Sequence, residues 1–126
     1  MHLILNMIKF KSLNRNEQFI EILKKKKINS KYFTLYFDKN KNNLKKLDKY
    51  LNISFVTKKK IGNAVKRNKI KRKLKAAVRK TLVENQFINL NYTYVIFGRN
   101  NVYKDKFPLV FGEVSNAFKK VKQMSY

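Results

Sequence analysis

The most constraining feature of this sequence is a long basic stretch in its middle that also carries an apolar pattern. Residues 49–83 contain thirteen Lys or Arg residues and no Asp or Glu. Within this stretch apolar residues recur at steps of three and four, which predicts an amphipathic helix over 64–85. Its other sides are cationic, so this helix must place a wide basic surface in solvent. The stripe expected to pack on the core consists of Ile70, Leu74, Ala77, Val78 and Leu82.

The charge of the whole chain indicates a polyanionic partner. Thirty-one basic residues against seven acidic ones give a net charge of +24 on 126 residues. Such self-repulsion opposes compaction, and binding a polyanion relieves it because neutralised phosphates release counterions. A single lysine run would indicate only a solvated face, but this total favours nucleic acid. An anionic membrane is the main alternative, although the sequence has no lipidation signal and no long apolar helix.

Length and composition predict one folded domain. Apolar residues make up 44% of the chain, which is enough for a core. We expect a loose N-terminal extension over 1–12, a nucleic-acid-binding domain over 13–122 and a tail over 123–126. The apolar start, residues 1–8, lacks the basic region and cleavage site of a signal peptide. The absence of Cys is compatible with a reducing cytoplasm, where we expect the protein to act.

Two further helices are expected, one on each side of the basic stretch. The first begins at Asn14, which can form a capping box with Glu17, and ends with Lys residues at 24–27. The last runs from 106 or 107 to 122, with Asp105 as a candidate cap and Pro108 in its first turn. Its apolar stripe consists of Val110, Val114, Ala117, Phe118 and Val121.

Alternating and β-branched runs predict the strands. Residues 32–37 and 51–56 alternate in the manner of strands, and a short strand over 57–60 extends or follows the second. Residues 92–98 indicate a buried strand. The expected fold is α+β: a single domain with a four-stranded, mostly mixed sheet packed with three helices, in the order α-β-β-β-α-β-α.

The sequence holds few groups for catalysis. His2 is the single histidine, there is no Cys, and no His or Cys cluster has the spacing of metal ligands. Glu17 and Glu21 are neighbours on one helix, which indicates solvation and helix-start charge. No Gly-rich phosphate loop or nucleophile elbow is present. We therefore expect no catalytic residue, no protein-held cofactor and no protein metal site.

The centre of the basic stretch contains a long ungapped motif. Residues 59–65 read Lys-Lys-Ile-Gly-Asn-Ala-Val, and residues 67–72 read Arg-Asn-Lys-Ile-Lys-Arg. Together they resemble the signature of the bacterial ribonuclease P protein subunit, which has a lysine pair, a Gly, Ala-Val and an Arg-Asn-x-x-Lys-Arg helix start. The similarity extends over about 13–121, and residues 15–19, 33–36 and 94–97 resemble the family's first helix, first strand and last strand.

The resemblance implies a ribonucleoprotein endoribonuclease that removes 5′ leaders from precursor tRNA. In that family the catalytic RNA carries the chemistry with bound Mg²⁺, while the protein binds this RNA and the leader. This agrees with the poor catalytic inventory of the chain. The resemblance also implies a left-handed βαβ crossover, whereas the general rule for such units would give a right-handed one.

The resemblance assigns two groups of site residues by position. Phe19 and Tyr36 match residues of a leader-binding cleft, and Leu23 falls where other members often carry Phe. Aromatic faces suit single-stranded RNA, at roughly 1–3 kcal/mol per stacked base. Phe19 as a core residue and Tyr36 as an ordinary sheet residue are the alternatives. The residues implied to bind the catalytic RNA are Lys59, Lys60, Asn63, Arg67, Asn68, Lys71 and Arg72.

Some positions depart from this pattern or have simpler interpretations. Lys58 stands where the family commonly has a small hydroxyl residue, and residues 1–8 have no counterpart. Asn68 is also suited to a structural hydrogen bond at the helix start, and Lys69 and Lys73 are expected to be solvated surface. The alternative function is a non-enzymatic RNA-binding protein, such as a ribosomal protein. A DNA-binding protein is a third, without a clear helix-turn-helix.

Overall fold

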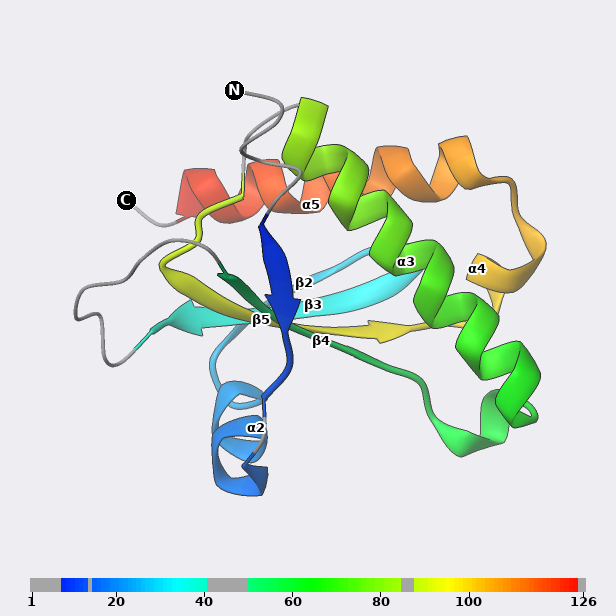
Figure 1. Cartoon of the computed structure of the whole chain (residues 1–126), viewed down its shortest axis with the longest axis horizontal. Helices are drawn as coiled ribbons and strands as arrows, with labels where there is room; N and C mark the ends of the chain where they lie inside the picture. Colours follow the sequence, from blue (N-terminus) through cyan, green and yellow to red (C-terminus); the bar gives the residue numbers. More distant parts are fainter. Residues whose placement is uncertain (1–7, 14, 41–49, 85–87, 125–126) are drawn as a thin grey trace.

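A five-stranded mixed sheet forms the centre of the molecule, with helices on both of its faces (Figure 1). The computed structural model describes residues 8–13, 15–40, 50–84 and 88–124. The strand order is β1-β4-β5-β3-β2, in which β1, β4 and β5 are parallel and β3 runs antiparallel to β5 and β2. The strands are β1 (Lys9–Lys11), β2 (Lys26–Asn29), β3 (Phe33–Lys39), β4 (Tyr50–Val56) and β5 (Tyr92–Gly98).

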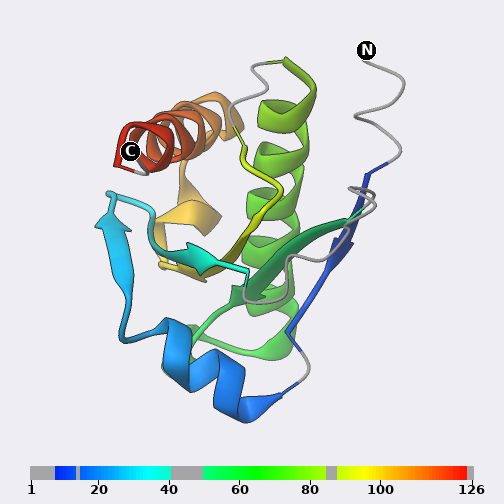
Figure 2. The same ribbon diagram turned by 90° about the vertical axis from the view of Figure 1, so that its left-hand side faces the viewer.

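The helices divide between the two faces of this sheet. α3 and α5 pack together on one face, whereas α2 lies on the other (Figures 1 and 2). α3 also forms the crossover between the neighbouring parallel strands β4 and β5; the hand of this crossover stays a prediction. No described helix is long and apolar enough to span a membrane. The helical segments are α2 (Asn16–Ile22), the short 3₁₀ helix η1 (Lys59–Ile61), α3 (Ala64–Glu84), α4 (Asn101–Lys104) and α5 (Phe107–Met124).

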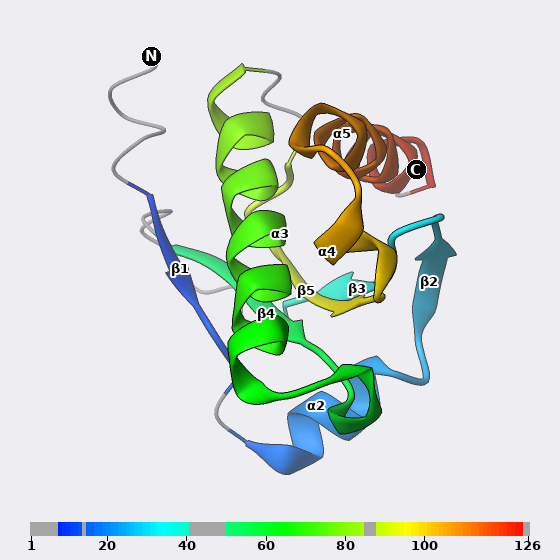
Figure 3. The same cartoon turned by 90° about the vertical axis from the view of Figure 1, so that its right-hand side faces the viewer.

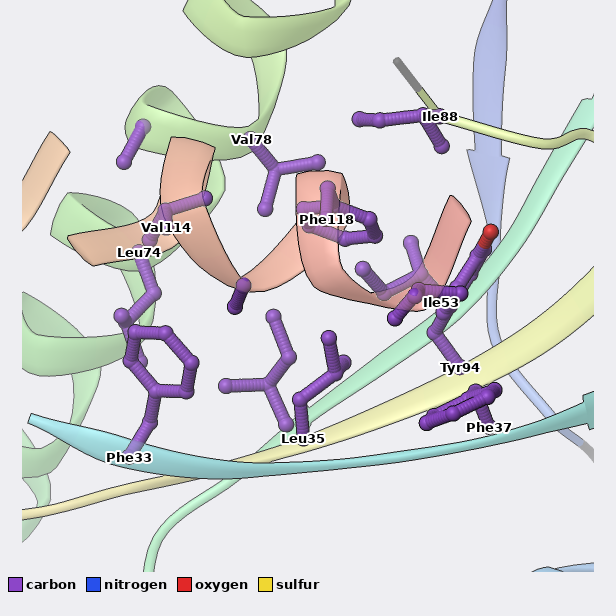
Figure 4. Packing of buried hydrophobic residues seen from close by; sticks show 14 of the residues in the cluster. Phe33, Leu35, Phe37, Ile53, Leu74, Val78, Ile88, Tyr94, Val114 and Phe118 are labelled. Atoms are coloured by element: carbon purple, nitrogen blue, oxygen red, sulfur yellow. The ribbon is translucent and has the colours of Figure 1, made fainter. Parts of the chain in front are cut away.

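The core lies between the sheet and the α3–α5 layer (Figure 4). Phe33 and Leu35 of β3 face the buried stripes of both helices. These stripes are the ones expected from the sequence, and all their members are buried. α3 approaches β5 closely at Gly98, where a Cβ would lie 2.8 Å from both Ile70 Cγ2 and Leu74 Cδ1. Glycine at this position therefore lets the basic helix sit directly on the sheet.

The region of the first helix differs from the expectation. α2 has Arg15 as its N-cap, without a side-chain capping bond, and it ends at Ile22. The expected cap, Asn14, lies outside the described residues. Lys26 and Lys27, expected in the last turn of the helix, belong to β2 instead. The reason is non-local: β2 pairs with β3, and this pairing buries Ile28 in the core.

Two short segments also differ from the expectation, and together with the unexpected β2 they give a sheet of five strands rather than four. Residues 9–11, expected in a loose extension, form β1 beside β4. Residues 57–60, expected as a short strand, do not form one, and Lys59 and Lys60 belong to η1. α4 was not expected, and Asp105 ends it rather than capping α5 through a side-chain bond; its carboxylate accepts a hydrogen bond from Tyr32. Most of the expected connection over 38–49 lies outside the described residues.

Candidate nucleic-acid interface

A tight loop leads from β4 into α3 and presents the first basic residues of the central motif. Lys59 and Lys60 lie in η1 and are exposed. Gly62 follows with φ of 158° and ψ of −165°, a backbone conformation that favours glycine. A Cβ at this position would lie 2.8 Å from Lys66 Cδ. The glycine therefore allows the chain to turn directly from η1 into α3.

Two residues of the motif hold the start of α3 in place. Asn63 Oδ1 accepts a hydrogen bond from the backbone N–H of Lys66 at 2.9 Å, which is the geometry of a helix N-cap. The Asn63 carbonyl oxygen also accepts a bond from the Arg67 backbone N–H at 3.0 Å. Arg67 Nε in turn donates to the Gly62 carbonyl oxygen at 3.0 Å. Asn63 and Arg67, both expected to bind RNA, therefore also have structural roles.

A row of polar side chains along α3, here called the open stripe, has no partner among the residues that the structure describes. Its members are three or four residues apart, so they share one side of the helix. Lys71 is partly buried and the others are exposed. Within the described ranges, none of them forms a hydrogen bond, ion pair or ring contact. The open stripe consists of Asn68, Lys71, Arg72 and Lys75.

A second row of lysines, here called the packed stripe, lies on the side of α3 that faces α4 and α5 (Figure 3). Lys73 Nζ donates to the carbonyl oxygens of Val102, at 2.9 Å, and Asp105. Lys66 Nζ lies 5.2 Å from the ring centroid of Tyr103, a cation–π contact. Lys80 makes a similar contact, at 5.0 Å, with a ring of α5. The packed stripe consists of Lys66, Lys73 and Lys80.

Arg79 lies at the end of the open stripe but is held by the N-terminal strand. Its Nη1 donates to the Ile8 carbonyl oxygen at 2.5 Å, and its Cζ lies 4.1 Å from the ring centroid of Phe10. Burial lowers the pKa of the Arg79 guanidinium. Arg79, one helical turn beyond Lys75, is therefore held by residues 8 and 10 of the N-terminal segment.

An aromatic cluster lies on the opposite face of the sheet, against α2. The ring centroid of Phe97 lies 6.0 Å from that of Phe19 and 5.7 Å from that of Tyr36. All three residues are partly buried. Leu23, also partly buried, lies one helical turn beyond Phe19 at the end of α2. Phe97 joins the expected leader-binding residues, and alternation along β5 could have identified it, because Tyr94 and Ile96 face the core.

The acidic side chains of the described chain do not gather into a reactive site. The Asp105 carboxylate accepts a hydrogen bond from the Tyr32 hydroxyl at 2.6 Å, which raises the pKa of Tyr32 to about 12. Glu113 accepts a bond from a serine hydroxyl, and Glu84 pairs with a lysine of the packed stripe at 2.7 Å. In the described ranges, no three His, Asp or Glu side chains are placed to hold a metal ion. His2 lies outside these ranges.

The two groups of expected site residues border one side of the molecule. The expected RNA-binding group occupies η1 and the first half of α3, and the expected leader-binding group lies on α2 and on β3 beneath it. α3 and α2 cover opposite faces of the sheet, yet η1 and the start of α3 lie toward the same lower edge as α2 in Figure 1. A polyanion contacting both groups would therefore pass along this edge.

The fold and this surface define a class of protein: a small basic α+β domain whose unpartnered cations lie on a helix backed by a mixed sheet. Residues 7–122 match the ribonuclease P family. Because this match covers nearly the whole chain, the chain belongs to the family of ribonuclease P protein components. Membership makes it a subunit of a ribonucleoprotein, a class in which an RNA partner is implied.

Individual relatives agree with this assignment over most of their length. The ribonuclease P protein component of Carboxydothermus hydrogenoformans is 34% identical over 119 residues, covering 93% of this chain and 96% of the relative. That of Mycoplasma mycoides is 30% identical over 111 residues, covering 87% and 94%. Among solved structures, the RNase P protein from Thermotoga maritima has a TM-score of 0.69 at 25% identity, covering 87% of this chain and 96% of its own.

Proposed function

We propose that this chain binds the catalytic RNA of ribonuclease P and the 5′ leader of precursor tRNA, and thereby assists endonucleolytic removal of the leader to give the mature 5′ end. The observation that carries the proposal is the open stripe, whose cations have no partner among the described residues and which includes residues 68, 71 and 72 of the central motif. Membership of the ribonuclease P protein family supports the same role.

The open stripe and η1 supply the contacts to the catalytic RNA. Lys71 and Arg72 have no protein partner in the described ranges, so their charges are available to phosphates. Lys59 and Lys60 extend this surface by one loop. Asn63 keeps the helix start in a fixed geometry, so the backbone that carries these cations does not have to be ordered when RNA binds.

The aromatic cluster on the α2 face suits the single-stranded leader. Phe19, Tyr36 and Phe97 offer ring surface that is only partly buried. Stacking on aromatic rings is tolerant of sequence, because every base has a π face, and it contributes roughly 1–3 kcal/mol per base. Leu23 extends the apolar surface without a ring of its own. A grip of this kind fits leaders of varied sequence.

The catalytic RNA supplies the chemistry together with Mg²⁺, which is held mainly by RNA phosphates. The donor set of the protein fits this division, because the described carboxylates are dispersed and no three of them converge. The polypeptide contributes positive charge, which lowers the repulsion between two RNA molecules and thus the Mg²⁺ needed to bring them together.

Reconstitution tests the proposal. The purified protein, added to its cognate catalytic RNA, should allow cleavage of precursor tRNA at Mg²⁺ concentrations where the RNA alone is slow. Absence of enhancement at every Mg²⁺ concentration would reject the proposal. Co-sedimentation with ribosomal particles, rather than with the catalytic RNA, would indicate the ribosomal alternative instead.

A pair of variants tests the leader surface in the same assay. Phe19→Ala should weaken binding of precursor tRNA relative to mature tRNA by about fivefold or more, the loss of roughly 1 kcal/mol of stacking. Phe107→Ala is the matched control, because this ring is also partly buried and stacked on another phenylalanine, on the opposite side of the sheet. An equal loss for both tRNAs with Phe19→Ala would indicate a core role for that ring.

A further inference from the structure

The β2 edge places a lysine beside the aromatic cluster of the α2 face. Residues 24–27 are four consecutive lysines, all exposed. In the register of β2 and β3, Lys27 lies directly opposite Tyr36, and Ile28 lies opposite Leu35. Directly opposed residues of an antiparallel pair project from the same face of the sheet, with Cβ atoms about 5 Å apart. Lys27 and Tyr36 are therefore neighbours on one face.

Burial identifies which face this is. Ile28 and Leu35 are buried in the core on the α3–α5 side. Since side chains alternate along a strand, Lys27 projects from the other side, where Tyr36 contacts the aromatic cluster. Lys26 projects from the same side as Ile28 and is opposed by Phe37. The two adjacent lysines thus have the same charge and are both exposed, but they project from opposite faces of the sheet.

The rest of the α2 face sets a direction for an anionic chain along this edge. Arg99 Nη2 donates a hydrogen bond to Thr34 Oγ1 at 2.8 Å. Thr34 lies two residues before Tyr36 on β3 and on the same face, so this bond holds a second cation near Tyr36. Asp38 lies two residues after Tyr36 on β3 and on the same face. Successive residues on one face of a strand are about 6.7 Å apart. Phosphates would be attracted toward the Lys27–Arg99 side and repelled from Asp38.

We propose that Lys27, on the β2 edge, binds a backbone phosphate of the single-stranded leader whose base stacks on Tyr36. This inference rests on the proposed function and adds to it a positioning residue that belongs to neither the central motif nor the aromatic cluster. Lysines on edge strands also hinder strand-to-strand association, but that role applies to Lys26 and Lys27 alike. Only the phosphate contact distinguishes the two.

The test compares Lys27→Gln with its matched control Lys26→Gln in the reconstituted holoenzyme. Each variant removes one charge from the same strand. Lys27→Gln should weaken binding of precursor tRNA about three- to fivefold at low salt, the scale of one exposed charge contact, and should leave binding of mature tRNA unchanged. The slope of log affinity against log salt should fall by about 0.7, the value for one phosphate of a single strand. Lys27→Arg should restore both quantities, and Lys26→Gln should change neither.

The outcomes separate the inference from the proposed function. Equal effects of the two glutamine variants, or an equal loss for precursor and mature tRNA with Lys27→Gln, would overturn the role of Lys27 while the holoenzyme still preferred precursor tRNA. If the unmodified protein gave no preference for precursor over mature tRNA, the leader-binding function would itself be wrong, and the role of Lys27 with it.

Discussion

The open stripe and the packed stripe lie on the same helix, come from the same basic stretch and differ in what the protein does with their charge. Lysines of the packed stripe bind carbonyl oxygens or aromatic rings of α4 and α5. Side chains of the open stripe have no described partner. Counting Lys and Arg along α3 therefore does not identify the RNA-binding surface, because a lysine already held by the protein has less to offer a phosphate.

The cause of the difference is the packing around α3. On one flank, the carbonyl oxygens of Val102 in α4 and of Asp105 directly after it accept hydrogen bonds from Lys73. On the other flank, the N-terminal segment contacts α3 at Arg79, beyond the open stripe. The expectation that Lys73 is simply solvated surface is therefore wrong: it ties α3 to α4. Variants of the open stripe and of the packed stripe should therefore differ in their effects on RNA affinity and on the free energy of unfolding.

The largest expected effect is on RNA affinity and comes from the open stripe. The double variant Lys71→Ala with Arg72→Ala should weaken binding to the catalytic RNA by about thirtyfold, since two phosphate contacts at about 1 kcal/mol each are lost. The slope of log affinity against log salt should fall by about 1.8. Thermal unfolding of the free protein should change little, because neither side chain has a described partner.

The packed stripe should respond in the opposite way. Lys73→Met keeps most of the side-chain volume but removes the hydrogen bonds to Val102 and Asp105. We expect a loss of about 1–2 kcal/mol in the free energy of unfolding, measured in denaturant, because the lost bonds are charge-assisted but only partly buried. The RNA affinity of the folded variant should change less than threefold, in the range of a distant surface charge. If Lys73→Met lost more free energy of RNA binding than of unfolding, Lys73 would behave like a residue of the open stripe, and the distinction between the two stripes would be wrong.

Asn63 tests the boundary between the structural and RNA-binding roles. Asn63→Ala removes the cap of α3 and should cost about 1 kcal/mol of stability. Asn63→Asp retains a capping oxygen and suits the helix dipole, so stability should be preserved. The new negative charge should nevertheless weaken binding to the catalytic RNA. If Asn63→Asp bound this RNA as tightly as the unmodified protein, the helix start would not lie in the interface.

The last expected effect is a pH dependence of stability on the packed side, outside the range in which RNA binding would be measured. The hydrogen bond to Asp105 raises the pKa of Tyr32 from 10.0 to about 12, so the folded state holds the phenolic proton more tightly than the unfolded chain. This contribution is complete below pH 10 and is lost as pH rises to about 12. Relative to Tyr32→Phe, the unmodified protein should lose its stability advantage over this range in denaturant titrations. A constant difference up to pH 12 would contradict the assignment.

Dense apolar patterns made the main elements predictable. α3, α5 and β5 each carry a repeated apolar signal over many residues, and the structure places them within two residues of the expected ends. β1 and β2 have three and four residues and contribute few core side chains, such as Ile28 in β2. Their strand conformation depends on partners far along the chain, so no local pattern could indicate it.

In the candidate site, too, local features were predictable from the sequence and contacts between distant segments were not. The central motif predicted which residues gather at η1 and the start of α3, because they follow one another in sequence. The separation into two stripes was not predictable, since Lys73 reaches a carbonyl oxygen 29 residues away. Phe97 was missed although alternation along β5 places it on the α2 face. Its contact with Phe19, which joins β5 to α2 on that face, depends on segments far apart in the sequence.

Lysine acylation footprinting tests the open stripe most directly. The free protein and its complex with the catalytic RNA would be labelled in parallel, and the modified lysines quantified by mass spectrometry. The account predicts strong protection of Lys71 and Lys75 by the RNA, with little change at the exposed Lys106 and Lys120 on the α5 side. Protection of Lys106 and Lys120, with Lys71 and Lys75 labelled as in the free protein, would contradict it.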